Sequence, residues 1–169
     1  TRPRNGYDCE RGDDPINRYP FAIEGAKGAK VYGGLFKGNI PLGTDWQFTY
    51  CNSAGIRLEN VPQARVSNQR MDRLWDAFRI GKRSQGFEIR NAWVTNTRDD
   101  CVENDFLMSG KITNSLFDGC FVGISLAPRG KPDRRAEIEM DRVLLRLKAY
   151  DYKGKVRHGL PFKLRGKPP

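Results

Sequence analysis

The sequence predicts an all-β fold in which short strands wind as a parallel β-solenoid. Three observations support this prediction. The 18 glycines and 10 prolines interrupt the chain often. Apolar and polar residues alternate over runs of only three to five residues, which is typical of half-buried strands. These runs also recur at intervals of about 20–30 residues, which indicates a repeating structural unit.

Length and composition limit the possible classes of protein. The 169 residues suffice for one domain, and 38% hydrophobic residues are too many for a disordered chain. No apolar stretch approaches the roughly 20 residues of a membrane-spanning helix. The formal charge is +10, and residues 128–169 contribute most of it, with 13 Lys and Arg against 5 Asp and Glu. A basic surface attracts anionic partners, but no zinc-finger, RNP or P-loop motif points to nucleic acid.

The expected strands follow one another in two interleaved sets. An early coil is expected over residues 21–36. The first set comprises the runs Ile56–Asn60, Phe87–Asn91, Lys111–Asn114 and Ile138–Asp141, each closed by Asn or Asp. The second set comprises Asp76–Ile80, Asp100–Asn104 and Gly119–Gly123. A final coil is expected from Glu137–Tyr150 to Gly159–Leu164. The connections are too short for helical crossovers, so each strand is expected to pair in parallel with its equivalent one turn later.

Two segments interrupt the winding. Residues 127–134 form a basic insertion of about eight residues between equivalent positions. Residues 150–157 have the same character. Loops that project from a rigid scaffold often carry binding surfaces, although either segment can equally be a solvated excursion.

The four cysteines have no CxxC spacing, which makes structural zinc improbable. Cys101 and Cys120 occupy equivalent positions in successive runs, so they are expected either to form a disulfide or to lie as buried thiols. Cys9 and Cys51 have no assigned partner.

Acidic residues are expected to meet on neighbouring coils. Aligning Asp76–Ile80 with Asp100–Asn104 places Asp76 beside Asp100 and Arg79 over Glu103. The equivalent position on the next coil, which we call the third rung, is Gly119. If Phe78, Ile80, Val102 and Phe121 point inward, then Arg79, Glu103 and Val122 point outward. We call the resulting group the acidic ledge; its members are Asp76, Asp99, Asp100, Glu103 and Asp105, with Arg79 and Arg98 as counter-charges.

The acidic ledge is open to three interpretations. Neighbouring carboxylates cannot all ionise freely, so one can act as an acid and another as a base in glycoside hydrolysis. Alternatively, Asp99, Asp100, Glu103 and Asp105 are expected to hold Ca²⁺ through oxygen ligands. A third interpretation is purely structural, with turn aspartates capping backbone amides.

The runs Trp75–Ile80, Arg98–Asp105 and Phe117–Ser125 resemble successive coils of the right-handed parallel β-helix of the pectin-lyase-like superfamily. The resemblance covers residues 21–164 and implies about five coils, which can be part of a longer solenoid. In the similar polygalacturonase family, aspartates act in acid–base chemistry, and Asp76 and the pair Asp99–Asp100 match these motifs. Asp118–Gly119 stands where that family has its histidine motif, and the single His158 comes one coil later.

Lyase members of the superfamily imply another chemistry. Elimination from a uronic acid needs a base and a cation that neutralises the carboxylate. The candidate bases are Arg79, His158 and Lys163, and Lys163 aligns with the column of Arg79 and Glu103. Trp75 is expected to stack on sugar rings, with Arg79 and Arg98 gripping substrate, whereas Trp93 is expected in the core. Trp46 is a further candidate for stacking.

We therefore expect a single β-helix domain over residues 1–169, acting on an anionic polysaccharide by lyase or hydrolase chemistry. The candidate catalytic residues are Asp76, Asp99, Asp100, Glu103, His158 and Lys163. The alternative is a noncatalytic carbohydrate-binding or structural protein. We expect an extracellular or periplasmic location, with no secretory signal in the given chain, no nucleic-acid partner and no membrane span.

Overall fold

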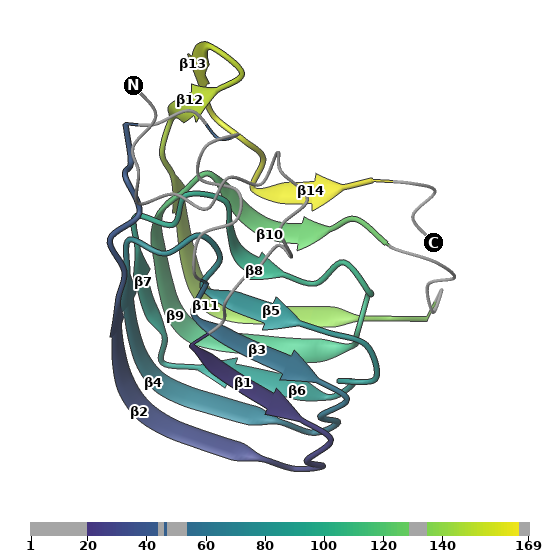
Figure 1. Cartoon of the computed structure of the whole chain (residues 1–169). Coiled ribbons are helices and arrows are strands. Elements are labelled where there is room, and N and C mark those ends of the chain that lie inside the picture. Colours follow the sequence, from purple (N-terminus) through teal and green to yellow (C-terminus); the bar gives the residue numbers. More distant parts are fainter. Residues whose placement is uncertain (1–19, 44–45, 47–53, 129–134, 166–169) are drawn as a thin grey trace, which may run out of the picture.

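The computed structural model describes residues 20–43, 46, 54–128 and 135–165, and the regular elements of this part of the chain are β-strands (Figure 1). The first sheet contains six strands in spatial order: β1 (Phe21–Glu24), β3 (Ile56–Glu59), β5 (Phe78–Ile80), β8 (Asp100–Glu103), β10 (Val122–Leu126) and β14 (Phe162–Leu164). Neighbouring strands of this sheet run parallel throughout.

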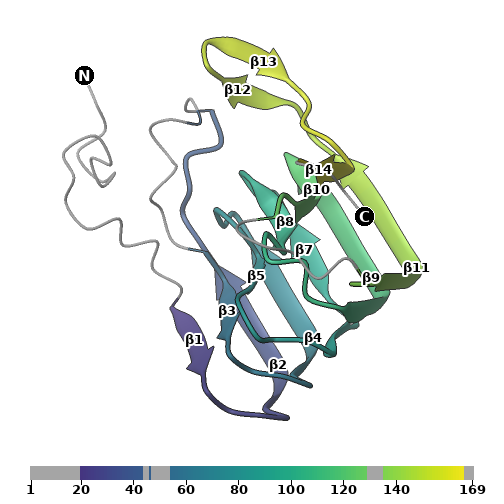
Figure 2. The ribbon, with the colours of Figure 1, turned by 90° about the vertical axis from the view of Figure 1, so that its right-hand side faces the viewer.

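The second sheet is also parallel. Its strands, in spatial order, are β2 (Lys30–Lys37), β4 (Arg65–Asp72), β6 (Phe87–Arg90), β9 (Gly110–Cys120) and β11 (Ile138–Leu147), and the short β7 (Trp93–Thr95) pairs with both β4 and β9. A third, antiparallel pair is the hairpin of β12 (Tyr150–Tyr152) and β13 (Lys155–Arg157), which extends beyond the two parallel sheets (Figure 2).

The chain alternates between the two parallel sheets, and each new strand pairs with the strand that the preceding circuit added (Figures 1 and 2). Long-range pairing of this kind is what a repeat of about 20–30 residues predicts. The all-β prediction is confirmed, and the arrangement is compatible with a β-helix or solenoid. Among the described residues, no helix has the length and hydrophobicity needed to span a bilayer.

The core lies between the two parallel sheets. In β3 and β6, apolar residues alternate with polar ones, so one side chain in two is buried. The register stacks these buried residues into columns, such as Ile56, Phe78, Val102 and Ile124 on successive strands of the first sheet. Phe78, Ile80 and Val102 point into this core, as predicted.

Asparagines mark the bends of the second sheet. Asn68, Asn91 and Asn114 all have positive φ, a conformation that asparagine tolerates better than most residues. Asn91 donates to Asn68 Oδ1 at 2.9 Å, and Asn114 donates to Asn91 Oδ1 at 2.6 Å. The side-chain amides therefore form a hydrogen-bonded ladder at this bend, and the ladder links three successive circuits.

The predicted grouping of strands is wrong in two places. The run at Ile56 belongs to the first sheet, with β5 and β8, because the prediction missed β4, the preceding strand of the second sheet. The run Gly119–Gly123 is not one strand, since β9 ends at Cys120 and β10 begins at Val122. Val122, and not Gly119, therefore pairs with Asp100 in the third rung.

The two segments that were predicted to interrupt the winding have different outcomes. Residues 150–157 do leave the parallel sheets, as the hairpin β12–β13. Within residues 127–134, positions 129–134 lie outside the described residues, and so do Cys9 and Cys51. Trp93 is not in the core: β7 turns Val94 inward, which leaves Trp93 45% exposed on the outer face beside Arg70.

Candidate functional site

A cavity of about 510 Å³ lies against the outer face of the first sheet, on the side that carries the acidic ledge. One part of its lining comes from β5, β8 and the turns beside them, and another part comes from the hairpin β12–β13 and the segment that leads to β14. All members of the acidic ledge line it, together with Trp75, Arg79, His158 and Lys163. The structure thus brings the predicted catalytic residues to one cavity.

The parallel register explains this convergence. Arg79 pairs with Glu103 between β5 and β8, as predicted. Ser125 of β10 pairs with both Glu103 and Lys163, so Lys163 does continue the same outward column one strand beyond β10. Because residues in register on parallel strands lie about 4.8 Å apart per strand, their side chains can reach a common space.

Three aspartates form the centre of the site. One carboxylate oxygen from each of Asp76, Asp99 and Asp100 lies within 4.8 Å of the other two, and all three residues are buried. Asp76 Oδ1 accepts a hydrogen bond from the backbone N–H of Asp100 at 3.0 Å. Asp76 precedes β5, whereas Asp100 begins β8, so this contact joins two circuits of the chain.

Burial alters the acidity of these three groups. Loss of hydration raises the pKa of Asp76 well above its ordinary value, and repulsion from Glu103, Asp100 and Asp99 raises it further. Burial also raises the pKa of Asp99 to about 6, although Lys163 and a hydrogen bond from Trp46 act in the opposite direction. The pKa of Asp100 is raised well above its ordinary value by burial and by Asp99.

Lys163 binds one of these aspartates directly. Its Nζ donates to both carboxylate oxygens of Asp100 at 2.9 Å. Burial disfavours the charge of Lys163, but attraction to Asp100 and Asp99 outweighs that effect and raises the pKa of Lys163. The side chain is therefore a protonated ammonium group at neutral pH.

The two remaining ledge residues have other partners. Glu103 forms an ion pair with Arg79 at 3.1 Å. Asp105 Oδ1 accepts a hydrogen bond from Ser125 Oγ at 2.5 Å. Within the described part of the chain, the acidic group compact enough to hold a metal ion comprises Asp76, Asp99 and Asp100, without Glu103 or Asp105.

This donor set fits calcium poorly. Ca²⁺ takes six to eight oxygen ligands as a rule. Here the compact group offers three carboxylates, and an ammonium group already binds both oxygens of one of them. The predicted calcium ligands Asp99, Asp100, Glu103 and Asp105 are further divided, because Arg79 and Ser125 engage the last two.

Aromatic residues form another part of the cavity lining. Trp75 lines the cavity but is only 1% exposed, so it supports the floor and offers little surface to a ligand. Trp46 packs against Trp75, with ring centroids 5.3 Å apart, and against Tyr152 at 5.5 Å. The ring of Tyr152 stacks on Phe121 at 5.4 Å. The prediction that Phe121 points into the main core is wrong, because it packs in a separate cluster with Val122 and Tyr150.

Arg98 does not line the cavity, although the sequence suggests it as a ligand for substrate. Its side chain is fully buried and lies against the rings of Phe121 and Tyr150. It donates a hydrogen bond to the backbone carbonyl of Asp151. Arg98 therefore joins the hairpin β12–β13 to the turn that carries Asp99, which is a structural role.

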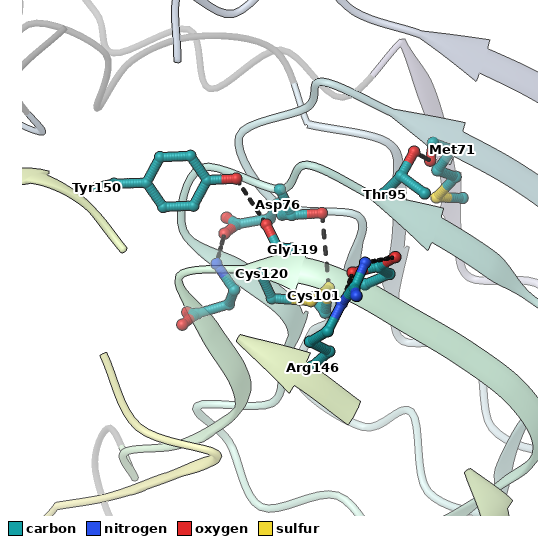
Figure 3. Close-up of a disulfide and its surroundings, with 11 residues drawn as sticks. Met71, Asp76, Thr95, Cys101, Gly119, Cys120, Arg146 and Tyr150 are labelled. Carbon is teal, nitrogen blue, oxygen red and sulfur yellow. Dashed lines mark hydrogen bonds and ion pairs between the residues drawn. A yellow bond between two sulfur atoms is a disulfide. The ribbon is translucent and has the colours of Figure 1, made fainter. Parts of the chain in front are cut away.

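A disulfide between Cys101 and Cys120 lies directly behind the site (Figure 3). Cys101 follows Asp100 in β8, whereas Cys120 ends β9, so the bond crosses between the two parallel sheets. Asp76 and Tyr150 lie nearby in Figure 3, where the Tyr150 hydroxyl donates to the carbonyl of Gly119 at 2.6 Å. Of the two predicted alternatives, a disulfide or a pair of buried thiols, the disulfide is present. The two cysteines do not occupy equivalent positions, however, because they belong to different sheets.

The sequence prediction missed the contribution of the hairpin. Tyr152 and Arg157 of the hairpin both line the cavity. The sequence did offer a signal for them, because the segment 150–157 contains aromatic and basic residues. This segment lies outside the repeat, however, so the repeat could not show that it lies close to the acidic ledge.

Comparison of the chain with known protein families, with curated proteins and with solved structures finds no match. The functional argument therefore rests on the site itself.

Proposed function

We propose that this chain is a right-handed parallel β-helix of about five coils, related to the pectin-lyase-like superfamily. The winding order of the parallel strands supports this proposal, and so does the Asn ladder at the repeated bend. The positions of Asp76 and Asp99–Asp100 on adjacent circuits match the motifs on which the resemblance to polygalacturonases rests.

We further propose that the protein hydrolyses glycosidic bonds of an acidic polysaccharide. The observation that carries this proposal is the set of three buried aspartates facing one cavity, with unequal acidities. Glycoside hydrolysis requires one protonated and one ionised carboxyl group at the same bond, and unequal environments are how identical side chains acquire these roles. The high pKa values also reduce the negative charge of the ledge, so an anionic chain is not excluded from the cavity.

Asp76 is the best candidate for the general acid. Burial and three neighbouring carboxylates favour its protonated form. Asp99, with a pKa of about 6, is ionised at neutral pH and is the candidate nucleophile. A separation of at most 4.8 Å is closer to the roughly 5–5.5 Å of retaining enzymes than to the roughly 6.5–9.5 Å of inverting enzymes.

The corresponding reaction has two steps. The anomeric carbon forms a bond to Asp99 while its bond to the leaving oxygen breaks, and Asp76 gives its proton to that oxygen. Asp76 then takes a proton from water, whose oxygen displaces Asp99 from the anomeric carbon. Lys163 holds Asp100 in place beside both groups.

Elimination is supported less well. A lyase base must be neutral at working pH, whereas the raised pKa of Lys163 keeps it protonated and Arg79 is bound to Glu103. His158, which lines the cavity, is then the remaining base of the predicted set.

A noncatalytic carbohydrate-binding protein is the second candidate. It is favoured by the engagement of Asp100 with Lys163 and of Asp76 with the Asp100 backbone, since both contacts also stabilise the fold. We also propose an extracellular or periplasmic location, because disulfides persist mainly in oxidising compartments.

The deciding experiment is incubation of the protein with uronate-containing and neutral polysaccharides, with and without Ca²⁺. New reducing ends that appear without an unsaturated product support hydrolysis, provided that Asp76→Asn abolishes them. An unsaturated product, detected by its ultraviolet absorbance, would instead assign a lyase. Binding with neither product would assign the noncatalytic function.

A further inference from the structure

The hairpin β12–β13 brings an arginine to the cavity. Arg157 lines the cavity at the end of β13. In the part of the chain that the structure describes, no acidic group forms an ion pair with Arg157. By contrast, Arg79 is bound to Glu103 and Lys163 to Asp100. Arg157 is therefore available to an anionic group of a ligand.

Aromatic packing holds this guanidinium group in place. The Arg157 guanidinium carbon lies 4.2 Å from the centre of the Tyr152 ring. Tyr152 in turn stacks on Phe121 with an angle of 16° between the rings, and it packs against Trp46. A guanidinium stacked on an aromatic face keeps its N–H donors in its own plane, where they can bind a carboxylate with two parallel hydrogen bonds.

The hairpin itself is anchored beside the aspartates. Buried Arg98 donates to the carbonyl of Asp151, and the Tyr150 hydroxyl donates to the carbonyl of Gly119. These contacts tie the first strand of the hairpin to the turn before β8 and to the end of β9. Arg157 is thus presented by a fixed support, which lowers the entropy lost when it binds a ligand.

We propose that Arg157 selects substrates that carry a carboxylate, and that Tyr152 positions its guanidinium group for this contact. The substrate class is then a uronate-containing glycan, and its neutral ester is the form that Arg157 discriminates against. This inference rests on the proposed function, since it assumes that a glycan enters the cavity.

The test measures binding and cleavage of short galacturonate, mannuronate and glucuronate oligomers, each beside its methyl ester. The ester has the same sugar backbone without the charge. We expect the wild-type protein to bind one acidic oligomer at least about tenfold more tightly than its ester, as a charge-assisted bidentate contact implies. Arg157→Gln should remove that preference by weakening acid binding about tenfold or more, with ester binding unchanged.

Matched variants separate carboxylate recognition by Arg157 from the effects of overall charge and of misfolding. Lys155→Gln removes a charge from the same strand, and Lys155 does not line the cavity, so this variant should keep the wild-type preference. Tyr152→Phe should also keep it, whereas Tyr152→Leu should lose part of it, because only the latter removes the aromatic face. Circular dichroism should show the same fold for all of these variants.

The outcomes distinguish the two proposals. If Arg157→Gln still prefers the acid form by the wild-type ratio while the oligomer is cleaved, then the role of Arg157 is overturned and the hydrolase proposal stands. If Lys155→Gln abolishes the preference equally, then the effect reflects overall charge and the role of Arg157 is also overturned. If no oligomer is bound or cleaved, both proposals fail.

Discussion

Lys163 Nζ lies 2.9 Å from both carboxylate oxygens of Asp100, although 63 residues separate them in the sequence. Lys163 belongs to β14 and Asp100 to β8, and β10 lies between these strands. The ion pair therefore fastens the last described strand of the first sheet across its neighbour and onto the candidate site. The pair is largely buried, which makes its loss costly because one charge would remain without its partner.

We expect Lys163→Met to destabilise the protein by roughly 3 kcal/mol at neutral pH, as for other buried pairs with one partner removed. Without the ammonium group, native Asp100 keeps its proton to still higher pH, while the unfolded chain releases it near pH 4. The native state then binds more protons, so the loss of stability should grow as pH rises. Urea unfolding at pH 5 and pH 8 measures this. Lys111→Met, in the exposed pair with Glu139, is the control and should have a much smaller effect at both pH values.

Asp76→Asn should abolish activity and stabilise the fold. The amide oxygen can still accept the N–H of Asp100, and the buried side chain no longer has to take up a proton on folding at neutral pH. We expect turnover to fall at least about 100-fold, as on removal of a general acid, and stability at pH 7 to rise by about 0.5–2 kcal/mol. A thermal melt and a reducing-end assay measure the two effects. Asp118→Asn, in an exposed pair with Arg146, should have neither effect. Loss of stability in Asp76→Asn would contradict the assigned acidity.

The pH dependence of activity should follow Asp99. Because burial raises the pKa of this group to about 6, the fraction of ionised Asp99 increases as pH rises through that value. Under the proposed mechanism, kcat/KM should therefore rise about tenfold per pH unit below pH 6 and level off above it. The raised pKa of the general acid Asp76 should place the descending limb at higher pH. A rising limb centred near pH 4, typical of an exposed aspartate, would assign the nucleophile to another group.

Local spacing was sufficient to predict much of the ledge. Asp76 and Asp100 are 24 residues apart, and so are Arg79 and Glu103, because the circuit between β5 and β8 has no insertion. The alternation of residues along these strands then determines which side chains face outward. The next rung could not be predicted in the same way, since the 11-residue β9 extends to Cys120 and moves the pairing partner of Asp100 to Val122.

The contribution of the hairpin depends on tertiary contacts that leave no periodic signal. Its position results from the buried guanidinium of Arg98 and from the packing of Tyr152 on Phe121. Trp93 illustrates a different limit. In a three-residue strand such as β7, one residue of misalignment exchanges the inward and outward faces, so Val94 takes the buried position expected for Trp93.

Removal of the Cys101–Cys120 disulfide should weaken both the fold and the site. The bond closes a loop of 19 residues, for which about 3 kcal/mol of stabilisation is expected. Because Cys101 follows Asp100, release of the bond should also reduce activity. Unfolding of the double variant Cys101→Ala/Cys120→Ala measures the first effect, and the reducing-end assay measures the second. The wild-type protein with reductant should resemble the variant. Equal stability of the double variant and of the wild-type protein without reductant would show that the sheets hold the site without the bond.

The Asn ladder allows hydrogen bonding and backbone conformation to be separated at one residue. Asn91 has a φ of 53° and bonds to both Asn68 and Asn114. Asn91→Gly loses the side-chain bonds but tolerates positive φ, so it should cost about 1–2 kcal/mol. Asn91→Ala loses the same bonds and also places a Cβ in the left-handed region, which adds about 1–2 kcal/mol. Urea unfolding of both variants gives the two contributions. Equal stability of the glycine and alanine variants would mean that the bend relaxes on substitution, and the stacked amides would then be the main reason for asparagine at this position.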